Sequence, residues 1–457
     1  MGSMAAHKTT LILMTALCGS LVAVWSLLPH PALIAVICIL PFAILFVLNQ
    51  TFWFVSLFVL FSFFRIHEAF PVIYSLKIPL LLSLGALSAL MWHTLISQKM
   101  NTYWHPSMTH LVIFWGLVTI GSILASNPGL SITYFKNIYW KIIVMTLAIA
   151  WLVDSEDAVK KIATLIIISG ALISGVAIFN SLNGIGLVEG TRVTIGRDLG
   201  SVLGDPNDLS LVLMFPLAFA ISFATTQQIG MARILGVVGV ILAVWAVLAT
   251  QSRGGLLGSL AVFGMFGLRL IRSKSLLITL GIIAATALFF MAGISDRQSG
   301  GAAEEGIDES AMGRLYAWEA AFKMALSNPL TGVGLNNFYA NYFFYSSHWD
   351  GLNHAVHSTW FGVLAETGFL GLGAFIWLIR GLIKTSRETL STLDSNRANY
   401  SPYLVATAMA VYAGIVGTIV SGTFLTQGFT WPIYILSALC IAISRITQNS
   451  SQNEKTR

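Results

Sequence analysis

Two histidines, His354 and His357, lie three residues apart, immediately before a long apolar stretch of the sequence. A neutral imidazole accepts a proton readily near neutral pH, so a histidine at the mouth of a membrane helix is a candidate general base. We predict that His357 is this base, because it opens the apolar helix and its backbone is therefore anchored. His354 lies one turn earlier, in a less constrained segment, and is expected to have a supporting role. The alternative is a histidine that is only hydrogen-bonded at the membrane interface.

An acidic residue, Glu366, follows His357 by nine residues, deeper along the same helix. We expect it to pair with an arginine or to support helix packing. The spacing of the two histidines is compatible with a metal pair, but the sequence has no HExxH motif and no cluster of cysteines and histidines. We therefore expect no metal ion and no other cofactor.

The segment 190–208, GTRVTIGRDLGSVLGDPND, places Arg192 and Arg197 among glycines. Glycine lets the backbone approach a ligand closely, and arginine offers a planar fork to phosphate. We predict that at least one of the two arginines binds an anion, Arg197 first and Arg192 in reserve. Asp205 and Asn207 precede an apolar stretch and are expected to cap its helix. An ordinary capped loop is the alternative.

Two further arginines belong to short polar segments. Arg253 lies in the tight turn TQSRGG (250–255), which Gly254 and Gly255 are expected to bend. It either contacts a substrate phosphate or reaches for lipid phosphate. Arg314 begins a predicted amphipathic helix whose apolar face holds Leu315, Trp318, Phe322 and Leu326, and such a helix is suited to the membrane surface. For Arg314, a role in the site and a structural role remain open.

The composition decides which elements must position these residues. The chain is 56% hydrophobic and only 10% charged, whereas soluble domains carry about 25% charged residues. Long continuous apolar stretches predict an all-α, polytopic membrane protein with 12–14 transmembrane helices and one large periplasmic loop carrying amphipathic helices. These stretches are approximately 9–28, 31–48, 51–65, 71–95, 108–126, 134–153, 158–180, 207–225, 231–249, 254–271, 274–293, 357–384, 402–421 and 428–446.

The charges predict the orientation. With the N-terminus in the cytoplasm, most lysines and arginines fall in inward loops, while the segment 294–356 has seven acidic and three basic residues. This follows the positive-inside rule. Ten basic residues oppose the bias, and such residues are functional candidates: Arg65, Lys77, Lys136, Lys141, Arg192, Arg197, Arg253, Arg297, Arg314 and Lys323.

This topology divides the chain into four parts. Residues 1–293 are N-terminal membrane helices with outer loops at 181–206 and 250–254. Residues 294–356 form the periplasmic loop, 357–446 the C-terminal membrane helices, and 447–457 a disordered cytoplasmic tail. The segments with candidate site residues all face the same side.

In order along the chain, four motifs resemble the O-antigen ligase and polymerase superfamily. They are Arg-x-x-Gly…Asp-Pro-Asn (197–207), Thr-x-Ser-Arg-Gly-Gly (250–255), Gly-Arg…Trp…Asn-Pro…Gly-x-Gly (313–334) and His-Ser-x-x-x-x-x-Leu-x-Glu-x-Gly (357–368). The resemblance covers the chain from about residue 70 to the end. Ser358 stands where the family usually has asparagine.

The resemblance implies a metal-independent glycosyltransferase of the bacterial inner membrane, with its active site facing the periplasm. The donor would be a glycan on undecaprenyl pyrophosphate, and the acceptor lipid A-core or another glycan, within a membrane-lipid environment and without nucleic acid. Arg197 or Arg192, together with Arg253, would bind the pyrophosphate, and His357 would be catalytic. Direct attack would invert the anomeric centre.

Several rival interpretations remain. A polysaccharide polymerase of the same superfamily shares the donor and the site, and some relatives glycosylate proteins instead. A transporter of the lipid-linked glycan would be expected to show internal repeats with broken helices, and the sequence has no such repeat. An intramembrane metalloprotease is disfavoured because its metal motif is missing.

Overall fold

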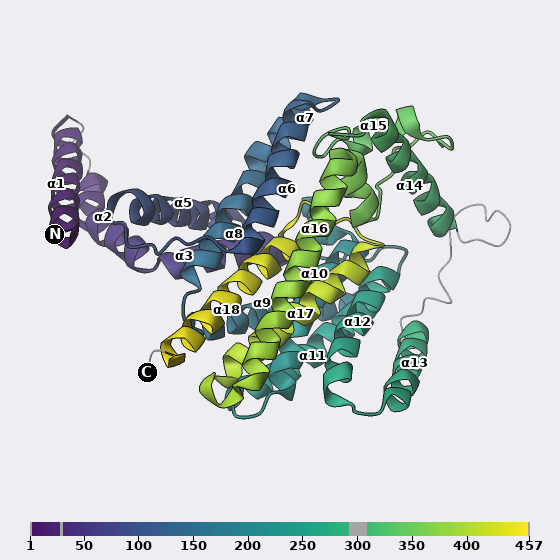
Figure 1. Cartoon of the computed structure of the whole chain (residues 1–457). Helices are drawn as coiled ribbons and strands as arrows, with labels where there is room; N and C mark the ends of the chain where they lie inside the picture. The colour runs from purple at the N-terminus through teal and green to yellow at the C-terminus, as the bar shows by residue number, and fades with distance from the viewer. Residues whose placement is uncertain (1, 28–30, 292–308, 456–457) are drawn as a thin grey trace.

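The computed structural model describes residues 2–27, 31–291 and 309–455. Arg297, one of the basic residues against the charge bias, lies outside these ranges. Helices make up the architecture, and no β-strand occurs in the described residues (Figure 1). The helices of the N-terminal half are α1 (Gly2–Leu27), α2 (Pro31–Asn49), α3 (Thr51–Phe64), α4 (Ile66–Ala69), α5 (Ile78–Met91), α6 (Pro106–Ile123), α7 (Pro128–Tyr134), α8 (Trp140–Leu152), α9 (Glu156–Asn183) and α10 (Pro206–Thr225).

The second half continues the same pattern. Its helices are α11 (Met231–Thr250), α12 (Arg253–Leu270), α13 (Lys274–Met291), α14 (Glu309–Ser327), α15 (Phe338–Tyr345), α16 (Thr359–Ser395), α17 (Pro402–Gly422) and α18 (Trp431–Lys455). Short turns of 3₁₀ or π-helix join or extend them, at Pro71–Leu76, Trp92–Ile96, Phe135–Tyr139, Arg197–Leu199, Val202–Gly204 and Arg397–Asn399.

The all-α, polytopic architecture is confirmed. Among the described residues nine helices are long and apolar enough to cross a membrane, or up to ten if the pair α2–α3, bent by 79°, forms one span. This is fewer than the predicted 12–14. Two of the predicted stretches merge into the bent pair, and the first stretch and 274–293 supply only shorter apolar helices there. Helix α12 is diluted by five glycines and two arginines.

Local sequence signals explain where several of these helices begin. Helices α6, α7, α10 and α17 each start with proline, and the residue before it accepts a backbone N–H with its side chain. Proline is suited to the first helical position because its missing N–H would have no helical partner there. For α10 the cap is Asp205, whose Oδ1 accepts from the N–H groups of Asn207 and Asp208 at 2.7 and 3.2 Å. The prediction that Asp205 caps this helix is thus confirmed.

Helix α10 is the core of the bundle. It packs against α9, α11, α12 and α17, and it lies among them in Figure 1. Most of its side chains are buried. Helices α1 and α2 project away from this bundle on the N-terminal side (Figure 1). The bundle thus fixes α10, and the loop before it, as a rigid reference for the candidate site.

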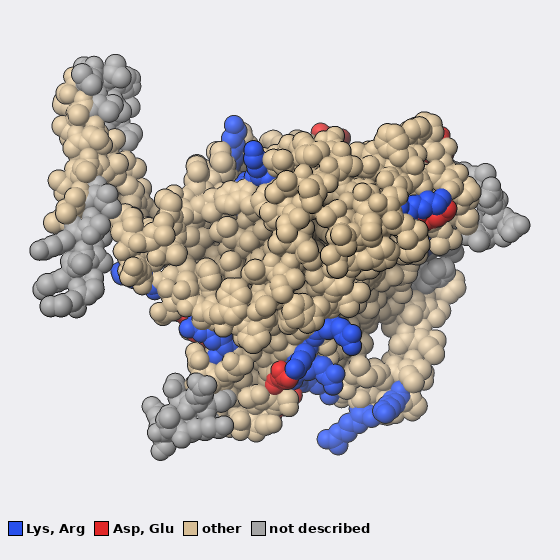
Figure 2. Space-filling view, turned by 45° about the horizontal axis from the view of Figure 1, so that its top comes forward, with Lys and Arg blue, Asp and Glu red and all other residues tan. Residues whose placement is uncertain are grey.

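Interhelical loops gather at two opposite ends of the bundle. At one end the Glu156 carboxylate accepts from the Ser401 N–H at 3.1 Å, and Tyr403 Oη donates to the Ile229 carbonyl at 3.0 Å. Arg269 pairs with Asp394 there. Lysines and arginines gather along the lower edge of the molecule in Figure 2. The end that holds these contacts is the one that the charge pattern assigns to the cytoplasm.

The last helix, α18, runs from Trp431 to Lys455. It therefore continues past Ile446, where the sequence analysis placed the start of a disordered tail. Tyr400 Oη donates to the carbonyl of Thr447 at 3.3 Å, and Thr447 is buried. This contact stabilises the helical conformation of α18 beyond the end of the apolar stretch that was predicted from the sequence.

Candidate functional site

The loop segments that carry the sequence motifs meet at the other end of the bundle. Arg192 Nε donates to the Thr250 carbonyl at 3.2 Å, and its Nη2 donates to Asn207 Oδ1 at 3.1 Å. Ser252 Oγ donates to the same Asn207 oxygen at 3.0 Å. The 190–208 loop, the start of α10 and the 250–254 turn are thus held together by one buried network.

His357 lies between two well-anchored backbone positions. On one side, Trp318 Nε1 of α14 donates to the Val356 carbonyl at 3.0 Å, and the Trp318 ring stacks on Phe361 at 5.1 Å between centroids. On the other, Ser358 is the N-cap of α16 and accepts from the Phe361 N–H at 3.5 Å. Serine and asparagine are both strong N-caps, so Ser358 fulfils the structural role that the family's usual residue could fill.

The loop 328–337 docks onto a break in α16. Gly368 has φ +69° and interrupts the helix, so that nearby carbonyls are free to accept from outside it. Val333 N–H donates to the Ala365 carbonyl at 2.8 Å, and Phe369 N–H donates to the Pro329 carbonyl at 2.8 Å. A Cβ on Gly368 would lie 2.5 Å from the Pro329 oxygen, so glycine is required there. The third and fourth motifs are therefore two halves of one structural unit.

Glu366 supports this unit. It is buried, and its carboxylate accepts from the backbone N–H groups of Asn336 at 2.8 Å and Phe338 at 3.2 Å. Phe338 begins α15, so a negative group at that point also compensates the positive end of the helix. Of the two roles expected for Glu366, the structure shows support of packing.

A cavity of about 620 Å³ opens beside His357. This volume is within the usual range for small-molecule sites, about 300–1,000 Å³. Its lining residues belong mainly to α3, α5, α7, α8, α10, α15, α16 and α18 and to the segments just before α10, α15, α16 and α18. Leu80 and Ile138 line the cavity and also belong to the exposed surface of the bundle. The cavity is thus open on the side where the membrane would lie.

Two cations line this cavity, Arg65 and Lys141. Arg65 follows α3 with φ +51°, and its Nε donates to Glu68 Oε2 at 2.8 Å, which fixes the guanidinium at the cavity wall. Lys141 is the second residue of α8, just after the π-helical turn Phe135–Tyr139. Such turns are frequent at functional sites. Both belong to the ten basic residues that oppose the charge bias, but neither was selected as a site residue, because no motif surrounds it.

Asp208 is a second group that sequence reasoning missed. It lies in the first turn of α10 and lines the same cavity as His357 and the two cations. The sequence analysis selected its neighbours Asp205 and Asn207, which are structural partners of the helix start and of Arg192. The cavity therefore holds two acidic side chains, Asp208 and Glu366, and the imidazole of His357, on walls contributed by different elements.

The four arginines selected from the sequence lie around the cavity rather than in its lining. Arg192 is 4% exposed and committed to the network with Thr250 and Asn207. Arg197 is exposed, and its Nη1 donates to the Gly204 carbonyl at 3.4 Å. Arg253 is the first residue of α12, and Arg314 lies in α14.

The turn at 250–255 differs from its expectation in one respect. Gln251, with φ +51°, makes the bend, whereas Gly254 and Gly255 are already helical. A Cβ on Gly255 would lie 2.3 Å from Ser210 Oγ. Gly255 is therefore needed for the close contact between α12 and α10, and it does not form the turn.

His354 stands apart from His357. Its Nε2 lies 2.9 Å from Asp350 Oδ2, and its side chain is 40% exposed. The ring also packs edge-on against Tyr342 at 5.4 Å between centroids. Of the two histidines, only His357 lines the cavity.

The electrostatic environment of His357 favours the neutral imidazole. Burial lowers the pKa of His357 below its usual value, and the positive charge of Arg314 lowers it further. The Asp205 carboxylate opposes this shift, while His354 adds to it. A neutral imidazole near neutral pH can accept a proton. Arg314, Asp205 and His357 are therefore close enough to interact, although they come from three separate segments.

The predicted amphipathic helix is α14. Leu315, Phe322 and Leu326 are exposed as an apolar stripe, whereas Trp318 turns inward against Phe361. The opposite face is rich in buried alanine and packs on α16. No group of three or more His, Cys, Asp or Glu side chains with metal-binding geometry occurs within 2–27, 31–291 and 309–455.

Comparison with known proteins gives one family match. Residues 238–376 match the family model of the O-antigen ligases, which is less than half of the chain. The matched segment contains the 250–255 turn, the docked loop, His357 and Glu366. No curated protein matches the sequence. The resemblance to the O-antigen ligase-like superfamily is confirmed by this match, which indicates a glycosyltransferase-type membrane enzyme.

Proposed function

We propose that the protein is an inner-membrane glycosyltransferase that moves a glycan from undecaprenyl pyrophosphate to an acceptor, lipid A-core oligosaccharide, at the periplasmic side. The observation that carries this proposal is the cavity that brings His357 together with Arg65 and Lys141. An imidazole and fixed cations are what transfer from a pyrophosphate leaving group requires. The family match supports the reaction class.

The donor enters from the bilayer through the open side of the cavity. The exposed Leu80 and Ile138 lie on that side, and the buried Phe58 and Ile142 also line the cavity, so its apolar lining suits a hydrocarbon chain. Arg65 and Lys141 bind the pyrophosphate, and Arg253 at the start of α12 and Arg197 in the loop before α10 add positive charge. Charge grows on the pyrophosphate as it departs, so preorganised cations stabilise the transition state more than the ground state.

The acceptor hydroxyl approaches from the opposite face of the donor sugar. Its oxygen forms a bond to the anomeric carbon while the bond from that carbon to the pyrophosphate oxygen breaks. The neutral imidazole of His357 takes the hydroxyl proton as the new bond forms. One direct displacement inverts the anomeric configuration. The undecaprenyl pyrophosphate leaves with the electron pair of the broken bond.

Transfer by the purified full chain tests the proposal. A lipid-linked oligosaccharide is supplied with either lipid A-core or a second lipid-linked repeat unit as acceptor. Product on lipid A-core supports the ligase. Product only on the lipid-linked unit identifies a polymerase, which shares the donor and the site, and no transfer to either acceptor refutes both the ligase and the polymerase.

Variants locate the donor site. Arg65→Ala and Lys141→Ala are each expected to weaken donor binding at least 10-fold, since a charge-assisted contact contributes about 1.5–3 kcal/mol. Lys136→Ala is the matched control, because Lys136 lies one turn earlier, is exposed and does not line the cavity. Equal effects of Lys136→Ala and Lys141→Ala would place the donor elsewhere.

A further inference from the structure

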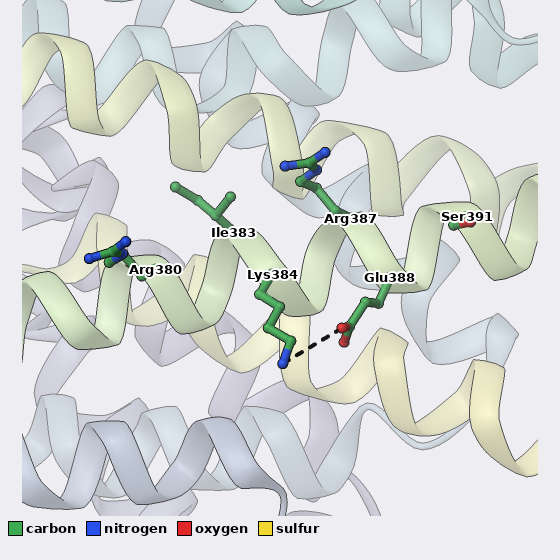
Figure 3. A pocket seen from close by; sticks show the side chains of 6 residues that line it. All are labelled: Arg380, Ile383, Lys384, Arg387, Glu388 and Ser391. Carbon is green, nitrogen blue, oxygen red and sulfur yellow. Dashed lines mark ion pairs between the residues drawn. The ribbon is translucent and has the colours of Figure 1, made fainter.

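A second charged hollow lies on α16, at the end of the bundle opposite His357. It measures about 500 Å³ and is lined by Arg380, Ile383, Lys384, Arg387, Glu388 and Ser391. The three cations are spaced four and three residues apart, which places them on one helix face. Figure 3 shows Arg380 and Arg387 two turns apart with Lys384 between them.

The cations in this hollow are poorly neutralised. Lys384 Nζ lies 3.9 Å from Glu388 Oε1, at the limit of an ion pair (Figure 3). Arg380 and Arg387 make no hydrogen bond or ion pair with any other residue that the structure describes. Three cations and one carboxylate leave a net charge of +2 at the hollow. It therefore complements an anionic group of matching size.

Contacts with α6 fix the depth of the hollow. Ser107 Oγ and Thr385 Oγ1 are 3.0 Å apart, and a Cβ on Gly381 would lie 2.4 Å from His110 Nδ1. Helix α6 begins at Pro106 and has 18 residues, a length of about 27 Å. This nearly equals the hydrocarbon thickness of a bilayer, about 30 Å. Residues 380–387 therefore lie where α6 enters the membrane, at the depth of lipid headgroups.

The other end of α6 confirms that the hollow is distant from the cavity. Just beyond α6, the Ser126 N–H donates to the Val333 carbonyl at 2.9 Å, in the loop that docks beside Glu366. The hollow and the cavity thus lie at opposite membrane boundaries. A role for the hollow in the transfer reaction itself would require a ligand to span the bilayer.

We propose that the hollow formed by Arg380, Lys384 and Arg387 binds the headgroup of an anionic phospholipid. The phosphate lies between the two guanidinium groups, and an acyl chain passes along Ile383 toward the membrane. Basic pockets at the ends of membrane helices bind such headgroups by charge and hydrogen bonding. The proposal depends neither on the glycosyltransferase assignment nor on which leaflet faces the hollow.

Native mass spectrometry of the full chain in detergent tests the proposal. The probe is dioleoyl phosphatidylglycerol, and dioleoyl phosphatidylcholine serves as the neutral comparison. We expect tighter binding of phosphatidylglycerol, weakened on the order of 100-fold by Arg380→Gln/Lys384→Gln/Arg387→Gln. This corresponds to about 3 kcal/mol at about 1.4 kcal/mol per decade. The variant Arg380→Lys/Arg387→Lys keeps the charge and should retain most of the binding.

A matched triple variant removes the same charge at the same end. Arg272, Lys274 at the start of α13 and Arg397 of the 3₁₀ turn are exposed, and none of them lines the hollow. Their combined change to glutamine should alter binding less than 3-fold. Equal losses in both triple variants would overturn the proposal, as would equal binding of phosphatidylcholine. Displacement of the lipid by millimolar inorganic phosphate at constant ionic strength would also overturn it, because free phosphate would then be the ligand.

Discussion

Replacement of His357 by asparagine tests the catalytic assignment most directly. His357 has φ +44°, a left-handed conformation that most residues adopt at a cost. Asparagine tolerates this conformation better than alanine does, so His357→Asn removes the imidazole while preserving the backbone. Trp318 and Ser358 hold the flanking residues in either case. Loss of activity can then be assigned to the missing base rather than to a moved loop.

The expected loss is about 10²–10⁴-fold in the single-turnover rate, the usual contribution of a general base. This equals roughly 3–5 kcal/mol in activation free energy. Donor binding should change little, because Arg65 and Lys141 remain. The matched control is His354→Asn, which removes an imidazole that pairs with Asp350 outside the cavity and should cost much less.

The pH dependence of the rate provides a second test of the same assignment. The neutral imidazole is the active form, so the rate should rise with pH through the pKa of His357, which lies below its usual value of 6.5. Arg314 helps to lower this pKa. Arg314→Gln should therefore raise the pKa of His357 and move the acid limb of the pH–rate profile to higher pH. The plateau rates of the variant and the unmodified protein at high pH are compared separately.

Three results would refute the reasoning. His357→Asn could retain its rate within 3-fold, which would exclude a required base at this position. It could fail only by losing donor binding, which would make His357 a phosphate ligand. Alternatively, the acid limb of the pH–rate profile of Arg314→Gln could stay in place or move to lower pH. The limb would then report the titration of a group other than His357.

Three further outcomes are expected. Arg192→Ala should lower the free energy of unfolding by about 1–3 kcal/mol, because the Thr250 carbonyl and Asn207 lose a buried donor; inactivity with an unchanged melting temperature would instead favour a direct substrate contact. EDTA should leave transfer unaffected, since no metal-ligand set occurs in the part of the chain that the structure describes; loss of activity that a divalent ion restores would contradict this. In spheroplasts, a cysteine at Ser347 should react with an impermeant reagent while one at Ser273 is protected; the reverse pattern would invert the topology.

Local signals predicted the helical framework well. Continuous apolar stretches mark membrane helices because each must bury its own backbone hydrogen bonds in lipid. A capping residue followed by proline marks the start of a helix because it satisfies backbone N–H groups that have no helical partner, as at Asp205. The number of membrane-spanning helices was predicted less well. One reason is that the pair α2–α3 bends by 79° at a position that hydropathy does not distinguish.

The candidate site was only partly predictable. Charge placement and motif order selected His357 and the surrounding loops, and the structure puts His357 at a cavity. The same reasoning selected both Arg192 and Arg197 as candidate anion ligands, Arg197 first and Arg192 in reserve. In the structure Arg192 is buried in a network that joins loops, whereas Arg197 is exposed. The difference depends on partners at Thr250 and Asn207 that sequence proximity does not reveal.

The sequence by itself determined the class of the molecule, the positions of its main helices and the chemical types available at its outer loops. These properties follow from hydrophobicity and charge along short segments. Only the tertiary structure brought Arg65, Lys141 and Asp208 to the same cavity as His357, and it assigned Glu366 to the loop before α15. Such groupings depend on how distant helices pack and where one of them breaks, and a side chain acquires its partners only when that packing is complete.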